Sequence, residues 1–406
     1  MMSMRMLCLF GLLSFCGCAA QAVEIAYTAG EHPFPGPMSV QAKQELSPGK
    51  YTRVDKVKGR QVAGQMDRHG RIWWWESGVK PGQPISYQLS GQVSPDIVAG
   101  KHDVELKVGD RAVGVYIRGD HFTTLNYKAN ESKPYLYPVI GPTGDPVTRS
   151  YPMKEVEGER QDHHHHRSLW CAHGNVRLAG KDRVDNFWHE GKGHDLQKLK
   201  RIIRMSTGPV FSQIETEIDW VDSESGERDF VEYRTYTFFS ANEDCRVIDI
   251  QNVFDFQDGD VTFGDDKEGG IIAIRVATSM DEKEPGKGMR HNSRGQSGDP
   301  TWGARAEWCD YVGPVNGKTI GIAVFDHADN YGHPSHWHFR DYGLYTANPF
   351  GLSHFDKKAG DGTKTWKKGE KAEFNYRVYI HKGDMEAGNV AGQYGLYANP
   401  PKIEIK

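Results

Sequence analysis

Short runs in which apolar and polar residues alternate recur along this chain, and this period of two constrains its fold more than any other feature. Residues 211–220 and 229–239 are the clearest pair, and the polar segment 222–226, Asp-Ser-Glu-Ser-Gly, lies between them. Such runs are typical of β-strands with one buried face, and turn residues between two of them predict an antiparallel hairpin. Further runs with strand character are 246–254, 270–278, 319–326 and 374–381.

Composition supports an all-β fold. The 406 residues include 46 Gly, 20 Pro, 17 Phe, 10 Trp and 18 Tyr, a mixture that favours many short strands and turns over a helical bundle or a coiled coil. The formal net charge of −4 gives no basic excess that would indicate binding to nucleic acid. Only residues 195–204 leave the choice open, because Leu196, Leu199 and Ile203 suit a short helix as well as a strand.

Residues 1–22 have the features of a secretory signal peptide. Arg5 is their only charge, the apolar stretch 6–15 is too short to cross a bilayer as a helix, and 20–22 (Ala-Gln-Ala) is a small-x-small cleavage site. We therefore expect export to the periplasm or the extracellular space. Alternatively, the leader is a lipoprotein signal with Cys18 as the lipidated residue. No later segment approaches the length of a membrane helix.

The remaining chain is expected to form two β units. Residues 23–115 would be a small N-terminal β module, and residues 116–406 a large β-sandwich or supersandwich that carries the functional site. Residues 103–108 and 112–117 flank a Gly-Asp turn and predict a hairpin in the module. The Trp triplet at 73–75 would send its middle indole to one side of a strand and its neighbours to the other, either for packing between sheets or for stacking on sugar.

Histidines gather in two windows of the large unit. Seven of the 18 lie within 163–194 and five within 327–354. Histidine side chains on strands are commonly satisfied by hydrogen bonds, but two such dense groups would be costly to desolvate unless they serve a site. In the four-histidine run, an extended backbone would send His164 and His166 to one face.

The second window contains the sequence His-Trp-His-Phe-Arg. Its i, i+2 spacing would place His336, His338 and Arg340 on one face of a strand, with Trp337 and Phe339 toward the core. Two imidazoles at this spacing are candidate ligands for a divalent metal of unspecified identity. Without a metal, the same rings would act as general acid or base, and Arg340 would stabilise negative charge.

A carboxylate partner is available on the strand 211–220. There Glu217 shares a face with Glu215 and Asp219 and would act as a base opposite a histidine, or else form a cross-strand ion pair. Candidate substrate-binding residues come from the segments around the histidines: Trp170, His173, Trp337, Tyr345 and Asn348.

The two histidine motifs also carry a resemblance. Residues 163–170 and 333–351 resemble those of a secreted bacterial family that bears the label "methane oxygenase PmoA", over roughly residues 115–385. The methane monooxygenase subunit of that name is an integral membrane protein, whereas this chain lacks a membrane helix, so methane oxidation is not carried over. The pattern also resembles, more weakly, the galactose-mutarotase-like β-supersandwich, in which His and Glu on a concave sheet act on a sugar ring.

The sequence thus predicts an exported carbohydrate-active enzyme, a lyase, hydrolase or epimerase, acting on a sugar derivative. The alternatives are a metal-dependent oxidoreductase or oxygenase, as the family label suggests, and a non-catalytic glycan-binding protein. All three hypotheses require the two histidine windows to lie close together in the folded chain. The residues assigned to catalysis are His164, His166, His336, His338, Glu217 and Arg340.

Overall fold

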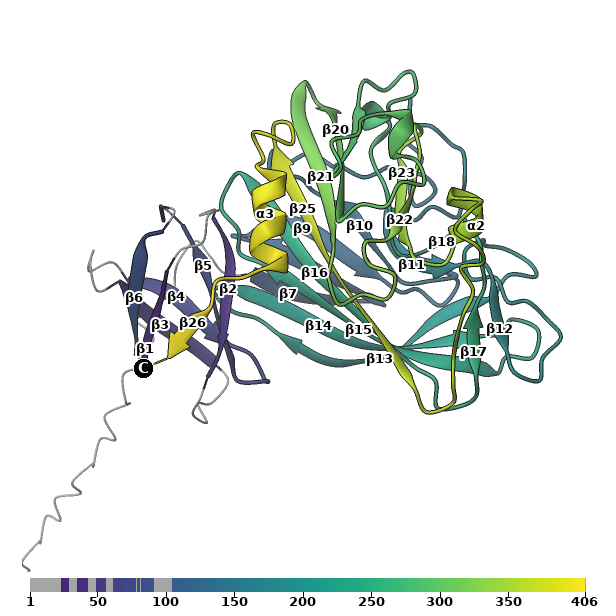
Figure 1. The fold of residues 1–406 in the computed structure, drawn as a ribbon, viewed down its shortest axis with the longest axis horizontal. Helices are drawn as coiled ribbons and strands as arrows, with labels where there is room; N and C mark the ends of the chain where they lie inside the picture. Colours follow the sequence, from purple (N-terminus) through teal and green to yellow (C-terminus); the bar gives the residue numbers. More distant parts are fainter. Residues whose placement is uncertain are drawn as a thin grey trace, which may run out of the picture.

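The structure is a computed structural model that describes residues 23–28, 35–42, 49–55, 61–77, 79–80, 82–90 and 104–405. The expected signal peptide, with Cys18, lies outside the described residues. The described chain consists mainly of β-strands in four sheets, which confirms the predicted all-β class (Figure 1). None of the helices in these ranges is long and apolar enough to cross a membrane.

The N-terminal sheet has seven strands in the order β2-β5-β4-β3-β6-β1-β26, so the last strand of the chain returns to the first (Figure 1). Antiparallel pairing of Ile25 with Ile405 joins these two strands. Its strands are β1 (Val23–Thr28), β2 (Gly36–Gln41), β3 (Gly49–Asp55), β4 (Gln61–Met66), β5 (Arg71–Glu76), β6 (Pro84–Ser90) and β26 (Ile403–Ile405).

Two eight-stranded sheets face each other and form the large sandwich. One, which we call the histidine sheet, has the order β22-β23-β18-β11-β10-β9-β8-β7. Its strands are β7 (Val104–Gly109), β8 (Ala112–Ile117), β9 (Asp120–Asn126), β10 (Tyr135–Val139), β11 (Leu169–His173), β18 (Gly269–Arg275), β22 (His336–Phe339) and β23 (Leu344–Asn348).

The other sheet, which we call the opposing sheet, has the order β13-β14-β15-β16-β25-β21-β20-β19. Side chains from both sheets, such as Ile214, Phe238 and Trp337, fill the core between them. Its strands are β13 (Leu196–Ser206), β14 (Phe211–Val221), β15 (Arg228–Phe239), β16 (Cys245–Asp255), β19 (Met289–Asn292), β20 (Trp308–Val315), β21 (Lys318–Asp326) and β25 (Lys371–Lys382).

Small elements complete the described fold. A three-stranded sheet, in the order β12-β17-β24, forms at one end of the sandwich. These elements are β12 (Val176–Leu178), β17 (Val261–Phe263), β24 (Lys364–Trp366), the 3-10 turns η1 (Thr278–Met280) and η2 (Asp299–Thr301), and the helices α2 (Leu352–Phe355) and α3 (Val390–Ala398).

The sheets divide the chain at a different place from the predicted boundary at residue 115. The predicted hairpin forms as β7 and β8, but β8 also pairs with β9, so the hairpin belongs to the sandwich. Its Val113 and Val115 are fully buried in the sandwich core, so the hairpin belongs to the large unit. Residues 196–204 of the ambiguous segment lie in strand β13, because this strand pairs with β14 from Leu196 to Ser206, with two register shifts.

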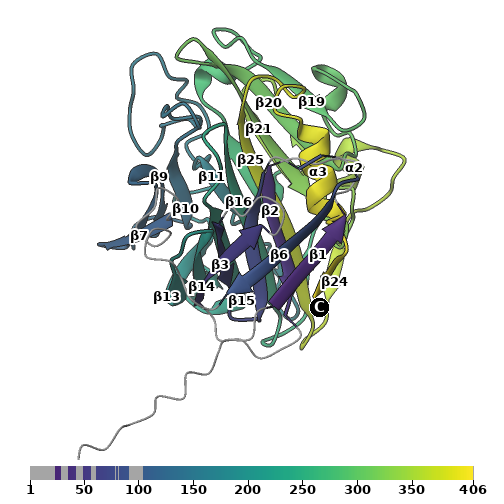
Figure 2. The same cartoon turned by 90° about the vertical axis from the view of Figure 1, so that its left-hand side faces the viewer.

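The tryptophan triplet of β5 joins the two units. Trp74 is buried inside the N-terminal module, while Trp73 lies with its ring centroid 5.5 Å from that of Phe239 on the opposing sheet. The side-chain carbonyl of Gln65 accepts hydrogen bonds from the backbone N–H groups of Val210 and Phe211. The module and α3 therefore cover part of the outer face of the opposing sheet, as Figures 1 and 2 show.

Candidate functional site

Alternation along the strands gives the histidine sheet a core face and an outer face. On β22, Trp337 and Phe339 pack in the core as predicted, so His336 and His338 point to the outer face. Across the sheet, His338 is in register with Thr346, Ala273 and Trp170 in turn. Three strand spacings of about 4.8 Å put His338 and Trp170 about 14 Å apart on one surface.

The four-histidine run is a turn rather than the extended segment that we predicted. The N–H of His166 donates to the carbonyl of His163, and His163 has a positive φ of 45°. Fully buried Arg149 causes this curl, because its guanidinium donates to the main-chain carbonyls of Arg160, Asp162 and His163. As a result, His164 is exposed and His166 is buried, and the two do not share a face.

The turn packs against aromatic rings on the outer face of the histidine sheet. The ring of His166 stacks on that of Trp170, with centroids 5.3 Å apart and planes 24° apart. The ring centroid of His165 lies 4.6 Å from that of His166 and 4.6 Å from that of His189. We call the whole group the imidazole cluster; its members are His163, His165, His166, His189, His194, Trp170, Trp188 and Tyr342.

Tyr342 brings the second histidine window to this cluster. Its ring stacks on His163 with centroids 4.9 Å apart and planes 10° apart, and the guanidinium of Arg340 lies 5.3 Å above the same ring. Burial lowers the pKa of His338 to about 3, and the charges of Arg340 and His163 act in the same direction. The two windows therefore converge through Tyr342.

Buried Arg275 fixes the protonation of His166. Its Nη1 lies 3.1 Å from Nδ1 of His166, and since a guanidinium only donates, Nδ1 is the acceptor. Burial, with the charge of Arg275 next, holds the pKa of His166 well below its usual value, so the ring is neutral with its proton on Nε2. Asp162 forms a 2.8 Å ion pair with Nη2 of Arg275.

His189 and Glu268 form an imidazole–carboxylate pair at the edge of the cluster. The side-chain oxygen of Asn186 accepts from the backbone N–H groups of Trp188 and His189, so its NH2 group donates to Nδ1 of His189. The proton of the neutral ring then lies on Nε2, 3.3 Å from a carboxylate oxygen of Glu268. Both side chains are about one-third exposed, at 31% and 36%, so this pair is open to solvent.

Several buried polar atoms around the cluster have no hydrogen-bond partner among the described residues. They are Nδ1 of His165, of His194 and of His338, and Nε1 of Trp170. Burial, with the charge of Lys133 next, lowers the pKa of His165 to about 2, so this ring is neutral at physiological pH. An unsatisfied buried polar group costs about 1–3 kcal/mol, so these atoms indicate a place for a polar ligand or water.

His336 lies on the same face, but its contacts hold the fold together. Its Nδ1 donates to the carbonyl of Gly303 at 2.7 Å, and its ring stacks on Phe355 of α2 with centroids 5.7 Å apart. Within the described ranges, the His, Cys, Asp or Glu side chains that lie close enough in threes to share one metal ion are aspartates, and neither His336 nor His338 is among them. These two imidazoles therefore have no third protein ligand in that part of the chain.

Glu217 does not share a surface with the histidines, contrary to our prediction. Ile214 and Ile218 point into the sandwich core, so alternation turns Glu217 to the outer face of the opposing sheet. There it pairs with Lys200 at 2.9 Å and with Arg201 at 2.6 Å. The hydrogen bond from Lys200 is the main cause that lowers the pKa of Glu217. The whole thickness of the sandwich separates it from the imidazole cluster.

Of the predicted substrate-binding residues, only Trp170 lies in the imidazole cluster. His173 is fully buried, with Nε2 bonded to the carbonyl of Gly264, because odd positions of β11 face the core. The side chains of the other three residues also form hydrogen bonds with main-chain groups. Trp337 donates to Ala306 O, Tyr345 donates to Ile322 O, and Asn348 donates to Asp266 O and accepts from the N–H groups of Phe350 and Gly351.

Sequence reasoning missed several residues of the site. Trp188 and His189 lie in the first histidine window, so the density of that window was the signal that could have found them. Tyr342 lies in the second window, two residues after Arg340, so the density of that window was its signal. Glu268 and Arg275 come from other segments, and no spacing in the sequence connects them to the histidines.

Comparison with known proteins gives a family and several distant structures. A family model described as "Family of unknown function (DUF6807)" matches residues 112–395, and its description carries no methane oxygenase label. A search of curated proteins found no match. Solved structures that match include a galactose mutarotase-like protein from Clostridium acetobutylicum, with 9% identity, a TM-score of 0.31 and coverage of 69% of this chain and 98% of that one. Another is a putative mutarotase from Salmonella typhimurium, with 9% identity, a TM-score of 0.25 and coverage of 69% and 97%.

Proposed function

This chain belongs to the DUF6807 family of unknown function, and we propose from the imidazole cluster that it is an exported enzyme performing acid–base chemistry on a carbohydrate. The observation that carries the proposal is a set of imidazoles whose Nδ1 atoms have no partner among the described residues, beside a solvent-accessible His189–Glu268 pair. General acid–base catalysis needs such groups within reach of one bound molecule.

One aromatic ring of the cluster supplies a surface that suits a sugar. Tyr342 is partly exposed and offers a flat apolar face on which the C–H groups of a pyranose ring would pack, whereas Trp170 and Trp188 are buried within the cluster. Nε1 of Trp170 and Nδ1 of His165 are buried and have no partner among the described residues, so a hydroxyl group or water that enters the cluster would bond to them. This combination of stacking and hydrogen bonding is common where proteins recognise small polar ligands.

The charged groups divide into a proton acceptor and stabilisers of negative charge. The carboxylate of Glu268 would remove a proton, and His189 Nε2–H would hold that carboxylate in place. His166 Nε2–H would donate to a substrate oxygen, and Arg340 would stabilise negative charge that develops on it. This division of roles fits a lyase or epimerase that abstracts a ring proton, and also a hydrolase.

A specific observation favours a metal-dependent oxidoreductase as the second candidate. His165 and His194 lie on either side of His189, at ring-centroid distances of 5.4 Å or less, and their Nδ1 atoms have no partner among the described residues. These two rings are the candidate ligands, since both nitrogens of His189 are paired, with Asn186 and Glu268. Imidazole ligands suit copper, zinc and non-haem iron. Elemental analysis separates the candidates, because a redox metal at one ion per chain supports the oxidoreductase, and its absence supports metal-free catalysis. The same measurement tests His336 and His338 as ligands.

The test of the enzyme compares two matched substitutions, Glu268→Gln and Glu217→Gln, on a panel of plant and algal glycan fragments. We expect Glu268→Gln to lower turnover by about 10²–10⁴-fold, the usual contribution of a general base, because the amide cannot accept the proton. Glu217→Gln should retain wild-type turnover, since Glu217 lies on the other side of the sandwich. Wild-type turnover in Glu268→Gln would refute the assignment. Glycan binding without any product would instead identify a non-catalytic binding protein.

A further inference from the structure

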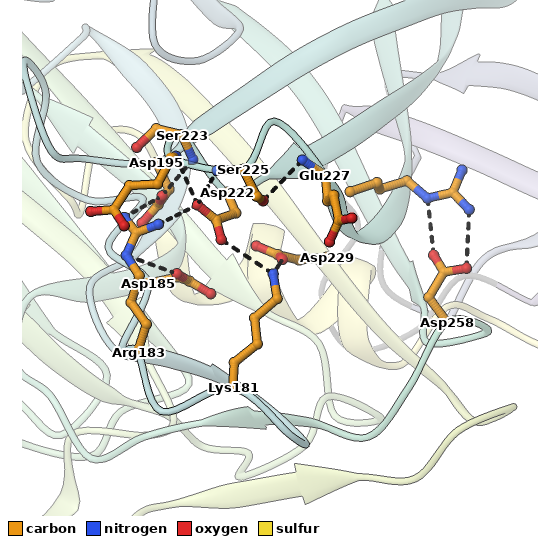
Figure 3. Close-up of polar contacts among 12 residues, drawn as sticks. Lys181, Arg183, Asp185, Asp195, Asp222, Ser223, Ser225, Glu227, Asp229 and Asp258 are labelled. Atoms are coloured by element: carbon orange, nitrogen blue, oxygen red, sulfur yellow. Dashed lines mark hydrogen bonds and ion pairs between the residues drawn. The ribbon is translucent and has the colours of Figure 1, made fainter.

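Four buried aspartates come together where the ends of β12, β13, β14 and β15 meet, apart from the imidazole cluster (Figure 3). They are Asp185, Asp195, Asp222 and Asp229, and none is more than 5% exposed. We call them the aspartate cluster. One carboxylate oxygen from each of Asp185, Asp195 and Asp222 lies within 4.8 Å of the others. Such spacing lets several oxygens contact one cation.

The positive charges within the cluster do not balance it. Arg183 contacts Asp222, Asp195 at 2.7 Å and Asp185 at 3.5 Å, and Lys181 contacts Asp229 at 2.8 Å and Asp222 at 3.3 Å. If all four carboxylates are ionised, these two cations leave a charge of −2. A buried charge of this size is strongly unfavourable unless protons or a counter-ion neutralise it.

Asp185 gives an independent sign of a missing partner. The residue is 0% exposed, and neither of its carboxylate oxygens has a hydrogen-bond partner among the described residues. Its neighbour Asp229, also 0% exposed, has one oxygen without a partner. Both side chains point into the cluster in Figure 3.

We propose that the aspartate cluster is a binding site for one Ca²⁺ ion, which supplies the missing charge of +2. The donors are all carboxylate oxygens, and hard divalent cations prefer oxygen ligands. Ca²⁺ fits better than Mg²⁺ because it accepts irregular geometry and bidentate carboxylates, whereas Mg²⁺ needs a near-ideal octahedron. This site goes beyond the proposed enzymatic function and stands without it.

The ion would fix the base of a loop that carries part of the imidazole cluster. Asp185 and Asp195 flank residues 186–194, and the two ends of this segment are joined by hydrogen bonds from the N–H of Asn186 to Asp195 Oδ2 and from the N–H of Asp195 to the carbonyl of Asn186. His189 lies on this loop. A cation held by both flanking aspartates would close the loop at its base.

The binding test is calorimetric titration of the EDTA-treated full-length secreted chain with CaCl₂, and thermal unfolding of the same sample. We expect one Ca²⁺ per chain and a Tm that rises with the logarithm of the Ca²⁺ concentration. Asp185→Asn should weaken binding at least tenfold. The matched control is Asp258→Asn, since Asp258 is 39% exposed and pairs with Arg228 outside the cluster, and it should bind like the wild type.

Absence of Ca²⁺ binding by the wild type would overturn the site, and so would binding that Asp185→Asn leaves unchanged. Equal affinity for Mg²⁺ would overturn the assignment of the ion. If Asp185→Asn does not fold, the wild-type titration and the Ca²⁺ dependence of its Tm still decide the question. These measurements involve no turnover, so their outcome is independent of the proposed enzymatic function.

The effect on the loop has its own test. Lys192 is exposed within the loop, so endoproteinase Lys-C cleavage after it reports opening of this segment. We expect Ca²⁺ to slow this cleavage at least threefold relative to EDTA, while cleavage after exposed Lys358, which lies outside the loop, keeps its rate. Equal cleavage at Lys192 in Ca²⁺ and EDTA would refute closure of the loop by the ion.

Discussion

Replacing Asp185 by Asn should stabilise the metal-free protein at neutral pH. Burial and the neighbouring carboxylates raise the pKa of Asp185 to about 7, against about 3.9 in an unfolded chain. Between these values the folded state binds more protons than the unfolded state, so the free energy of unfolding falls as pH rises. At 1.36 kcal/mol per pKa unit the full loss is about 4 kcal/mol. Removing this charge also reduces the repulsion between Asp185 and its neighbours Asp229 and Asp195, so the contributions of the three groups are not additive. We expect Asp185→Asn to raise the free energy of unfolding by about 2–4 kcal/mol above pH 7.

The assay is urea unfolding of wild type, Asp185→Asn and Asp258→Asn in EDTA at pH values from 4 to 8. The charged groups facing Asp185 are Asp195, Asp222, Asp229, Arg183 and Lys181. We expect the gain from Asp185→Asn to be near zero at pH 4, to grow through pH 5–7 and to be absent from Asp258→Asn. A gain that does not vary with pH, or no gain at pH 8, would refute the reasoning. With saturating Ca²⁺ the sign should reverse, because the variant then loses a ligand.

Two further substitutions test the packing of the sandwich. Arg234→Met should lower the free energy of unfolding by about 3–5 kcal/mol, since it leaves the fully buried carboxylate of Glu232 without its 2.6 Å partner. Urea unfolding measures this loss. Adding Glu232→Gln to the same chain should restore part of it. A loss below about 1 kcal/mol would contradict a buried, ionised pair. His336→Ala should lower the Tm more than His338→Ala, because His336 loses a 2.7 Å hydrogen bond to Gly303, whereas His338→Ala also removes a buried Nδ1 that has no partner among the described residues. The opposite order in thermal unfolding would contradict this reasoning.

The strands could be predicted because their signal is local. Residues 211–220 and 229–239 form β14 and β15, since each run places one apolar face on the core. The Trp triplet also separated as predicted, with Trp74 in the module and its neighbours against the sandwich. Strand β13 was ambiguous because its spacing fits both structures, and only pairing with β14 selects the strand.

The face that each strand presents depended on contacts distant in sequence. Glu215, Glu217 and Asp219 do share a face, but alternation alone does not say which face is the core. The neighbouring strand shows the difficulty, because Glu232 and Arg234 point into the core as a buried pair while Glu217 points outward. A polar pair can replace apolar residues in the core when its charges and hydrogen bonds are satisfied.

The four-histidine turn failed as a prediction for a similar reason. Its conformation comes from Arg149 at the far end of a loop, and the ring orientation of His166 comes from Arg275, 109 residues later in the chain. Neither contact leaves a periodic pattern in the sequence. Density of histidine therefore indicated where the candidate site lies and included Trp170 among its residues, whereas only the fold could pair His189 with Glu268.

The loop 186–194 connects the two proposals, and the direction of the coupling can be argued. Its base would be held by Ca²⁺ at Asp185 and Asp195, and its interior carries His189, which contacts Glu268. If the ion favours the closed loop and a bound sugar contacts His189 in that same state, each ligand raises the affinity of the other by an equal factor. That factor cannot exceed the differential affinity of Ca²⁺ for the closed and open loop. The aspartate cluster would then tune substrate binding without touching substrate, whereas the acid–base roles of His166 and Glu268 would remain intact in its absence.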